Sequence, residues 1–331
     1  MERTVGTRPG LGAFAAAAAL GVTLGLCAGA ADAADTSLRE AVLAQSGKYL
    51  EAPDVEGETK GVSIEAGSID EPTQPVSISM GDVSAEVSYQ ETQPGEDAAF
   101  TSKVTVLSGG EKVAELDVDE FNTRFPYTVQ IVEIDPANDT PEVVVSTYSG
   151  GAHCCGVPRV ATKSADADTW SVVDLGEFDG EPPIAKDYNG NGRSEFIVDD
   201  AAFLYTFGAY AFSVAPQVVL TVEGGEVKNV SADPAYEAVQ KSWMKQLVDI
   251  ARDDDVNAYL AGYVAQKSLL GEGDEAWTLM EQHYDKNDDW GLQTCDQPLT
   301  DAGVCPGEEV TLTYPEMLKR VLRENGYKIG G

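Results

Sequence analysis

The chain has 331 residues, and its 22 lysines and arginines against 56 aspartates and glutamates give a formal charge of −34. A surface this acidic repels nucleic acid and anionic lipid and attracts cations, which excludes nucleic-acid and membrane-surface binding as predicted functions. The chain has two histidines and neither a G-x-S-x-G nor an H-E-x-x-H pattern, so the common hydrolase signatures are missing.

Residues 1–33 predict a secretory signal peptide. Arg3 and Arg8 precede an uncharged apolar run, and small residues close the segment, which is the order typical of such signals. We expect cleavage near Ala33 or Ala34 and a periplasmic or extracellular location. No later segment approaches the roughly 18 apolar residues of a membrane span, so no membrane insertion is expected.

Residues 34–125 predict a short helix followed by β-structure. Ser37 and Glu40 have the spacing of a capping box at the start of a segment with apolar residues on one face. From about residue 61 the pattern changes to short alternating runs such as VSISM and SKVTVLS, which are typical of strands. SGGEK (108–112) predicts a hairpin turn between two of them.

Residues 126–232 contain an internal echo. Segments 131–155 and 182–210 each run from an Asp/Asn-rich loop into an apolar strand, and their lead aspartates, Asp135 and Asp187, lie 187 − 135 = 52 residues apart. Propeller blades repeat at roughly 40–50 residues. Because two blades cannot close a propeller, we predict a partial, propeller-like β unit packed against the N-terminal strands.

Residues 233–331 predict a helical region, in which apolar residues recur three and four positions apart. Four helical segments are expected, at 236–252, 255–270, 274–284 and 314–327. The loop between the last two holds Cys295 and Cys305. The whole chain is therefore predicted to be α+β, with β-rich N-terminal and central regions before a helical C-terminal region.

The loop DYNGNGRSE (187–195) offers oxygen ligands at alternate positions and has Gly192 at the sixth position, where the chain must turn. This pattern favours calcium. The predicted ligands are the side chains of Asp187, Asn189, Asn191 and Glu195 and the backbone carbonyl of Arg193. The twelfth position is Val198, which rules out an EF-hand, and only two ligands are charged, so the predicted affinity is in the range of about 10⁻⁴–10⁻³ M. An Asx-rich turn without an ion is the alternative.

This loop resembles the calcium loops of integrin-type FG-GAP and VCBS repeats. Together with TYSGGAHCC, VVDLGEFDG and FLYTFGAYAFSVAP, it makes residues 129–216 similar to uncharacterised secreted bacterial proteins that carry such repeats. The resemblance implies a β-repeat fold and a calcium ion, and no activity. The first loop, 135–142, has Ala137 where a ligand belongs; Asn138 and Asp139 are substitute ligands, and a plain turn is the favoured interpretation.

An aromatic run comprises Phe203, Tyr205, Phe207, Tyr210 and Phe212. Its spacing of two from 203 to 207 predicts one buried face of a strand, and a stacking platform for a glycan is the alternative. The stretch YSGGAHCC (148–155) has three interpretations: a Cys-His nucleophile, a soft-metal site or a disulfide. Four cysteines in an oxidising compartment favour two disulfides, and three pairings are open. We predict Cys154–Cys155, with room provided by the neighbouring glycines, and Cys295–Cys305.

These observations favour a secreted, periplasmic, calcium-supported β-repeat protein that binds a protein partner or an envelope component and catalyses no reaction. The alternatives are an envelope hydrolase that uses His153 or acidic residues, and a stress-response inhibitor that acts through the helical C-terminal region.

Overall fold

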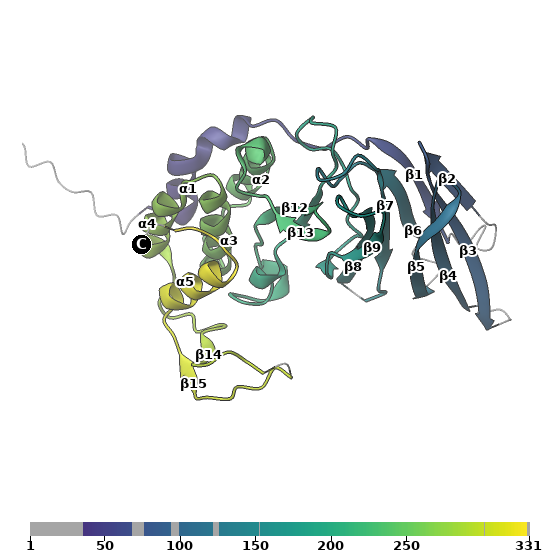
Figure 1. Cartoon of the computed structure of the whole chain (residues 1–331). Coiled ribbons are helices and arrows are strands. Elements are labelled where there is room, and N and C mark those ends of the chain that lie inside the picture. The colour runs from purple at the N-terminus through teal and green to yellow at the C-terminus, as the bar shows by residue number, and fades with distance from the viewer. Residues whose placement is uncertain are drawn as a thin grey trace, which may run out of the picture. The chain divides into compact units, whose positions relative to one another are not determined.

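The structure, a computed structural model, describes residues 36–67, 76–93, 99–121, 126–151, 153–300 and 302–329. The predicted signal peptide, residues 1–33, lies outside the described residues. The described chain is rich in antiparallel β-structure over its N-terminal and central regions and helical toward its C-terminus (Figure 1). This confirms the predicted α+β class.

The first helix begins where the capping box predicts. α1 (Leu38–Ser46) follows Ser37, whose hydroxyl oxygen accepts a hydrogen bond from Glu40 N at 3.2 Å. Ser37 N in turn donates to the Glu40 carboxylate at 3.3 Å. Arg39 donates to the carbonyl oxygen of Ala251 at 2.6 Å, so α1 is bonded to the C-terminal helical region, more than 200 residues along the chain.

The alternating runs form a four-stranded antiparallel sheet in the order β2-β3-β4-β5. Its strands are β2 (Val76–Met80), β3 (Val83–Gln93), β4 (Ala99–Ser108) and β5 (Glu111–Phe121). Ser108 pairs with Glu111 across Gly109 and Gly110, whose φ angles are 59° and 85°. A two-residue turn that matches the strand twist needs two left-handed residues, so the hairpin predicted for SGGEK is confirmed.

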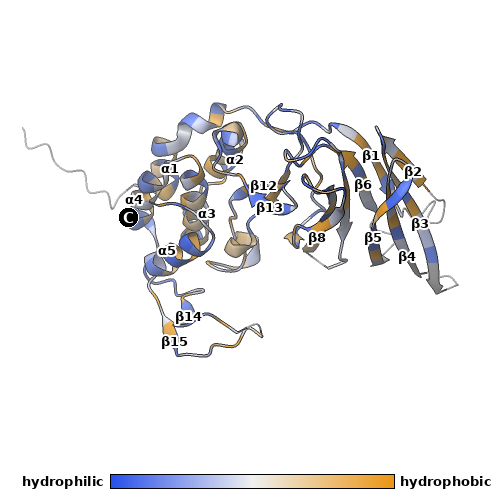
Figure 2. Ribbon diagram, viewed as in Figure 1, coloured by the Kyte–Doolittle hydropathy of each residue, from blue (hydrophilic) through white to orange (hydrophobic). Residues whose placement is uncertain are grey.

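A six-stranded antiparallel sheet has the order β1-β6-β7-β8-β10 with β9 also paired to β8, and its strands β6 and β7 are buried on both faces. Its strands are β1 (Gly61–Ala66), β6 (Tyr127–Val132), β7 (Glu142–Tyr148), β8 (Cys154–Lys163), β9 (Trp170–Asp174) and β10 (Phe178–Asp179). Along β7, Val143 and Val145 enter the core shared with β3 to β5, whereas Val144 enters the core shared with the helices. Burial on both faces of β6 and β7 extends to polar residues such as Gln130 and Glu142, whereas along β2 half-buried apolar residues alternate with exposed serines (Figure 2).

A smaller sheet, β11-β12-β13, follows in the chain. Its strands are β11 (Phe196–Asp199), β12 (Gln217–Glu223) and β13 (Glu226–Asn229). The two segments of the internal echo therefore contribute to different sheets, the first through β7 and the second through β11. Each runs from its loop directly into a strand, as predicted, and the propeller-like relation between them stays a prediction.

Four helices make up most of the C-terminal region and confirm the four predicted segments. They are α2 (Glu237–Asp249), preceded by the 3₁₀ turn η5 (Pro234–Tyr236), α3 (Val256–Leu269), α4 (Gly273–His283) and α5 (Tyr314–Glu324). The predicted loop between α4 and α5 carries a short hairpin of β14 (Gln293–Cys295) and β15 (Glu309–Thr311), and a Cys295–Cys305 disulfide closes it. None of the described helices combines the length and the apolar character needed to span a bilayer.

The aromatic run from residue 203 to 212 is not a strand, contrary to the prediction. It contains two 3₁₀ turns, η3 (Ala201–Phe203) and η4 (Tyr210–Phe212). Phe203 and Phe207 are buried as predicted, but Tyr205 is 57% exposed and Phe212 is 42% exposed. Tyr205 has a φ of 59°, in the left-handed region, which interrupts the in-and-out alternation that a strand would impose.

Candidate functional site

The predicted calcium loop is a series of Asx turns centred on Asp187, whose side chain is buried. Asp187 Oδ1 accepts from Gly190 N at 2.7 Å, and Asp187 Oδ2 accepts from Gly192 N at 2.9 Å. The side-chain oxygens of Asn189 and Asn191 each accept from the backbone N–H two residues ahead, at 3.0 and 2.7 Å. Gly190 and Gly192 have φ angles of 77° and 88°, so the loop turns at the two positions where the sequence supplies glycine.

Glu195, the last predicted ligand, is buried and connects the loop to the C-terminal region. Its Oε1 accepts from the Tyr236 hydroxyl at 2.8 Å, and its Oε2 accepts from Tyr188 N at 3.3 Å. Burial raises the pKa of Glu195, and these two hydrogen bonds oppose the rise. On the other side, Asp187 exchanges backbone hydrogen bonds with Glu58 at 2.9 and 2.8 Å. Tyr236 and Glu58 lie far from the loop in sequence, and the sequence analysis did not find them.

The donor set of this loop fits a hard divalent cation in its chemistry. Two carboxylates, two amide oxygens and a backbone carbonyl are all oxygen donors, which calcium prefers. Ser194, between the last two predicted ligands, has a buried hydroxyl oxygen with no hydrogen-bond partner within the described ranges of the chain. Buried polar atoms of this kind are rare in native proteins and point to a further partner such as an ion or a water.

The first loop, 135–142, is closed by its own last residue. Glu142 is fully buried, and its Oε2 accepts from the backbone N–H groups of Ile134 and Asp135 at 2.7 and 3.2 Å. Its Oε1 accepts from the Asn138 amide at 3.2 Å and the Thr162 hydroxyl at 3.1 Å. Burial raises the pKa of Glu142 to about 7 against the effect of these bonds. Since the protein supplies four donors to one carboxylate, the arrangement favours the plain-turn interpretation.

The two loops lie side by side. The Arg193 guanidinium donates to the carbonyl oxygen of Asp135 at 2.9 Å, and Ser194 N donates to the carbonyl oxygen of Glu133 at 2.7 Å. Arg193 thus contributes its side chain to the first loop, while its own carbonyl is a predicted ligand in the second. The internal echo of the sequence corresponds to a physical contact between the two loops.

Beyond the far end of β7, Cys154 and Cys155 form a disulfide across a cis peptide bond. A Cβ atom on Gly151 would lie 2.3 Å from the carbonyl oxygen of Cys154, and one on Gly156 would lie 2.7 Å from Pro182 Cα. Both glycines are therefore required by close packing around the pair.

The soft-metal and nucleophile interpretations of the same stretch involve different neighbours. The carboxylate of Glu177 lies within 4.8 Å of both sulfurs, which makes it the third ligand that a soft-metal site would use. The imidazole of His153 is exposed, and its ring centroid lies 4.3 Å from that of Tyr210. Neither Glu177 nor Tyr210 is close to the cysteines in sequence, so spacing alone did not indicate them.

An aromatic patch forms around this histidine, and we define it as His153, Tyr205 and Tyr210. The centroids of the two tyrosine rings lie 5.3 Å apart. The Tyr210 hydroxyl donates to the Asp179 carboxylate, and this hydrogen bond is the main reason that the pKa of Tyr210 rises to about 12. Trp290 Nε1 donates to the carbonyl oxygen of Tyr205 at 2.9 Å and fixes the turn that exposes the tyrosine. The aromatic patch and its partners Asp179 and Trp290 thus come from four separate parts of the sequence.

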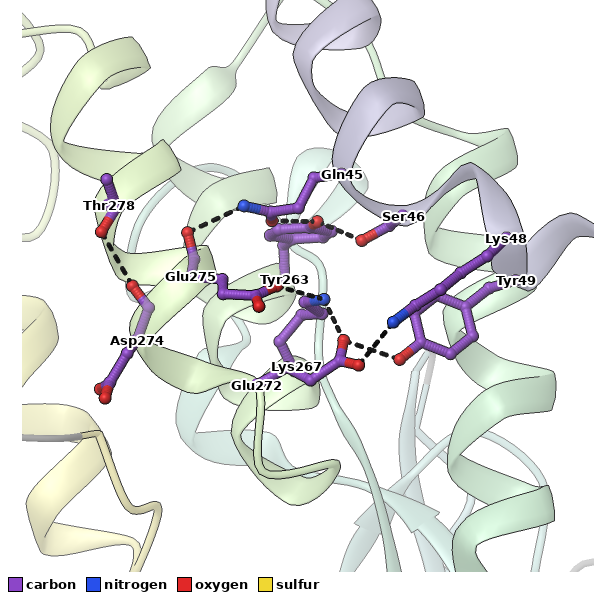
Figure 3. A network of polar contacts seen from close by, with 10 residues as sticks. All are labelled: Gln45, Ser46, Lys48, Tyr49, Tyr263, Lys267, Glu272, Asp274, Glu275 and Thr278. Atoms are coloured by element: carbon purple, nitrogen blue, oxygen red, sulfur yellow. Dashed lines mark hydrogen bonds and ion pairs between the residues drawn. The ribbon is translucent and has the colours of Figure 1, made fainter.

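A polar network binds the N-terminal helix to α3 and α4 (Figure 3). Lys267 is fully buried, and its ammonium pairs with Glu272. Glu272 also accepts from Lys48 at 2.6 Å and from the Tyr49 hydroxyl at 2.7 Å, both in the 3₁₀ turn η2 (Gly47–Glu51). Burial raises the pKa of Glu272, but the hydrogen bonds from Lys267, Lys48 and Tyr49 outweigh it and lower that pKa to about 2. The Lys267 ammonium is held in a buried ion pair that joins η2 to α3 and to the start of α4, so we assign the network a structural role.

The comparisons with known proteins place the chain in a family. A model of the sll0997 C-terminal domain matches residues 236–326. Over 253 residues, or 74% of each chain, the protein is 39% identical to a relative from Synechocystis sp. named "Probable thylakoid lumen protein sll0997". The chain therefore belongs to the family of that protein.

A second relative, "Uncharacterized protein y4bJ" from Sinorhizobium fredii, is 34% identical over 218 residues. The match covers 63% of this chain and about a third, 34%, of that relative. No solved structure matches the chain. The name of the first relative indicates a compartment, the thylakoid lumen. Neither name indicates a reaction.

Proposed function

We propose that this protein is an exported, non-catalytic binding protein that holds an envelope component in a compartment outside the cytoplasm. Two observations support the compartment: the predicted signal peptide, and a relative whose name places it in the thylakoid lumen, which like the periplasm is separated from the cytoplasm by a membrane. The even number of cysteines after residue 33 also suits an oxidising space.

The aromatic patch is the observation that carries the binding proposal. Tyr205 is 57% exposed, whereas Phe203 and Phe207 of the same segment are buried. The turn that exposes it is fixed by Trp290, and the neighbouring His153 lies beside a rigid, disulfide-bonded pair. Exposed aromatic rings held on fixed backbone supply contact area at a low cost in conformational entropy. The patch suits stacking against the apolar face of a ligand such as an envelope glycan.

We further propose that the loop 187–195 holds calcium through the ligands predicted from its sequence. Bound there, the ion would neutralise the two buried carboxylates of Asp187 and Glu195 and stabilise the loop. Because Asp187 is bonded to Glu58 and Glu195 to Tyr236, the loop connects the N-terminal segment, the central sheets and the C-terminal region. The ion is proposed as a structural support for the binding surface and not as a participant in a reaction.

The binding proposal can be tested by co-sedimentation of the purified protein with isolated cell-wall and membrane fractions of the producing organism. We expect retention on one fraction, with a loss of affinity of about 5- to 30-fold for Tyr205→Ala, because one exposed aromatic anchor contributes on the order of 1–2 kcal/mol. Val172→Ala is the matched control, since Val172 is an exposed apolar residue, 42% accessible, on β9. Equal retention of both variants, or no retention of the wild type, would contradict the proposal.

The substitution His153→Ala distinguishes the hydrolase alternative from the binding proposal. A binding protein should keep its fold and most of its retention, because His153 contributes one ring of three. An enzyme that uses His153 as a base should instead lose turnover by a factor of about 10² or more while its affinity is kept. Incubation with the retained fraction, followed by detection of released soluble products, decides between the two.

A further inference from the structure

The two disulfides that the structure describes differ in their exposure to solvent. Cys154 is exposed, and its partner Cys155 is 4% exposed. Cys295 is 3% exposed, and its partner Cys305 is half-buried. A thiolate opens a disulfide by attacking one of its sulfurs, so the rate depends on which cysteine the thiolate can reach. Cys154 is the exposed member of these two pairs and is therefore the accessible point of attack.

The two disulfides also differ in how much they stabilise the fold. Cys154 and Cys155 are adjacent in the chain, whereas Cys295 and Cys305 are 10 positions apart. The stabilisation that a disulfide provides grows with the length of the loop that it closes, because a longer loop has more conformational freedom to lose in the unfolded chain. By the same linkage, a disulfide that stabilises the fold only slightly is held closed only slightly by the fold. The fold therefore protects Cys295–Cys305 from reduction more than it protects Cys154–Cys155.

Hydrogen bonds hold the backbone of the adjacent pair independently of its sulfurs. Ser149 N donates to the carbonyl oxygen of Cys155 at 2.8 Å, and Cys155 N donates to Ser149 Oγ at 2.7 Å. Gly151 N donates to the carbonyl oxygen of Cys154 at 2.9 Å. Because none of these bonds involves a sulfur, they do not depend on the disulfide. They keep the two cysteines in one place after the disulfide opens, so that the two thiols can react with each other again.

Negative charge lies next to this disulfide. β10 pairs with β8, and the pairing brings Glu177, the residue before β10, so close that its carboxylate lies within 4.8 Å of both sulfurs. Glu177 is exposed, and among the described residues it forms no ion pair. The segment DLGEFDGEPPIA (174–185) has four acidic residues and neither a lysine nor an arginine. A negatively charged thiol compound is therefore repelled from the disulfide, and a positively charged one is attracted.

We infer that the Cys154–Cys155 disulfide is a site of thiol–disulfide exchange, and that its substrate is a dithiol on a basic peptide or protein. A thiolate of the dithiol bonds to Cys154 Sγ, the bond between the two cysteines breaks, and Cys155 Sγ leaves with the electron pair and takes a proton from water. The second thiolate of the dithiol then attacks the first sulfur of the dithiol, which releases Cys154 Sγ to take a proton as well. The dithiol is oxidised to a disulfide, and its two electrons reduce Cys154 and Cys155 to thiols.

The first experiment tests which sulfur reacts. The variants Cys155→Ala and Cys154→Ala each keep one thiol of the pair, and their reaction with cystamine, a small cationic disulfide, is followed by mass spectrometry of the adduct. We expect the Cys154 thiol to react at least about tenfold faster than the Cys155 thiol, because the first is exposed and the second is buried. In the wild type, dithiothreitol should open Cys154–Cys155 at least about tenfold faster than Cys295–Cys305.

The second experiment tests the charge of the substrate. Two dithiol peptides of equal length carry a C-x-x-C pair, flanked by lysines in one and by glutamates in the other. Each rate of opening is divided by the rate of the same peptide with bis(2-hydroxyethyl) disulfide, which removes intrinsic differences between the thiols. We expect the lysine peptide to be at least about tenfold faster at low salt, and the difference to shrink as sodium chloride is raised. Glu177→Gln should reduce it to about threefold, whereas Glu86→Gln, at an exposed glutamate on β3, should leave it unchanged.

Opening of both disulfides at the same rate, or equal reactivity of the two single thiols, would overturn the assignment of exchange to this pair. Equal rates for the two peptides, or the same difference in Glu177→Gln as in Glu86→Gln, would overturn the assignment of a basic substrate. Thermal unfolding of each variant checks that it is folded, and the wild-type rates decide the question where a variant is not. These experiments use no envelope material, so they can fail while the co-sedimentation result stands, and the reverse also holds.

Discussion

The two loops of the internal echo share a sequence pattern and differ in how their charges are satisfied. In the first, Glu142 accepts four hydrogen bonds, two of them from backbone N–H groups, and closes the loop without an ion. In the second, Asp187 accepts three hydrogen bonds from backbone N–H groups of its own loop. Its last residue, Glu195, accepts only two, from Tyr188 and Tyr236, and Ser194 beside it has a buried hydroxyl oxygen with no partner in the described residues. The carboxylate that ends the first loop is thus its structural closure, whereas Glu195, which ends the second, is the one that we propose as a calcium ligand.

The two segments of the internal echo, 131–155 and 182–210, are in contact at their loops and again beyond the C-terminal ends of β7 and β11. Arg193 and Asp135 are bonded at the loops, and beyond β7 and β11 the rings of His153 and Tyr210 are in contact. A loop that supports one end of these strands therefore bears on the geometry of the patch at the other end. The predictions below separate the contribution of each loop.

The largest effect is expected from Glu142→Ala. Removing this carboxylate leaves the backbone N–H groups of Ile134 and Asp135 buried without an acceptor, which should lower the free energy of unfolding by about 3–5 kcal/mol. Glu195→Ala, without added calcium, should cost less, about 1–3 kcal/mol, because one backbone donor and one hydroxyl are affected.

Urea unfolding measures both changes. Glu86→Ala, an exposed glutamate on β3, is the control and should stay within about 0.5 kcal/mol of the wild type. If the Glu142 variant is no less stable than the Glu195 variant, the proposed difference between the two loops does not hold.

The next effect is a pH dependence at the end of β11. Burial raises the pKa of Asp199 to about 6, the Gln217 side chain opposes the rise, and the nearby charge of Asp179 adds to it. Because the folded pKa lies above the unfolded one, the stabilisation is complete below the unfolded pKa of about 4 and is lost as the pH rises through about 6. Relative to Asp199→Asn, which has no charge to titrate, the wild type should lose at most about 2–3 kcal/mol of stability between pH 4 and pH 7.

Paired urea titrations at pH 4, 5, 6 and 7 measure this difference. Subtracting the Asp199→Asn values removes the titration of the many other carboxylates. A wild type that instead gains stability over the variant as the pH rises would reverse the sign and show that hydrogen bonding to Gln217 outweighs burial.

Calcium should distinguish the two loops directly. With a dissociation constant of about 10⁻⁴–10⁻³ M, 10 mM calcium should stabilise the wild type by roughly 1–3 kcal/mol, or a few degrees in melting temperature. Asp187→Ala should abolish that rise. Asp135→Asn, at the corresponding position of the first loop, should keep it, because that loop is closed by the protein's own donors.

Differential scanning calorimetry with calcium, with magnesium and with neither tests this prediction. A wild-type transition that ignores calcium up to 10 mM would show that the loop 187–195 is a turn. A rise that disappears in Asp135→Asn but not in Asp187→Ala would place the ion in the first loop.

The sequence predicted what depends on local pattern. The capping box of α1, the turn at Gly109–Gly110 and the four C-terminal helices follow from spacing and from glycine and proline positions, and all are confirmed. The resemblance to FG-GAP and VCBS repeats is not confirmed in this way, since the comparisons show the family of the "Probable thylakoid lumen protein sll0997" and leave the repeats a prediction.

The sequence failed where long-range contacts override local pattern. The spacing of Phe203, Tyr205 and Phe207 is that of a strand face, but Trp290, 85 residues further along, bonds the Tyr205 carbonyl and fixes a turn there. Tyr236 and Glu58, the partners of the loop 187–195, come from segments that only the folded chain brings together. Single-sequence reasoning carries no information on such contacts.

The smallest effect on stability is expected from removal of the Cys154–Cys155 disulfide, which follows β7 in the chain. A bridge between adjacent residues closes a very short loop, so the entropy that it removes from the unfolded chain is worth about 1 kcal/mol, against nearly 3 kcal/mol for the loop from Cys295 to Cys305. The double variant Cys154→Ala with Cys155→Ala should therefore stay within about 1 kcal/mol of the wild type in urea unfolding. It should also keep most of its retention on the envelope fraction, because His153, the residue before this pair, contributes one ring of three to the aromatic patch. Proteolysis without reduction, followed by mass spectrometry, checks the pairing itself: a peptide spanning Tyr148 to Arg159 should appear alone and two hydrogens lighter than its reduced form. A cross-linked product that joins this peptide to one containing Cys295 or Cys305 would defeat the assignment and would instead tie the central sheet covalently to the C-terminal hairpin.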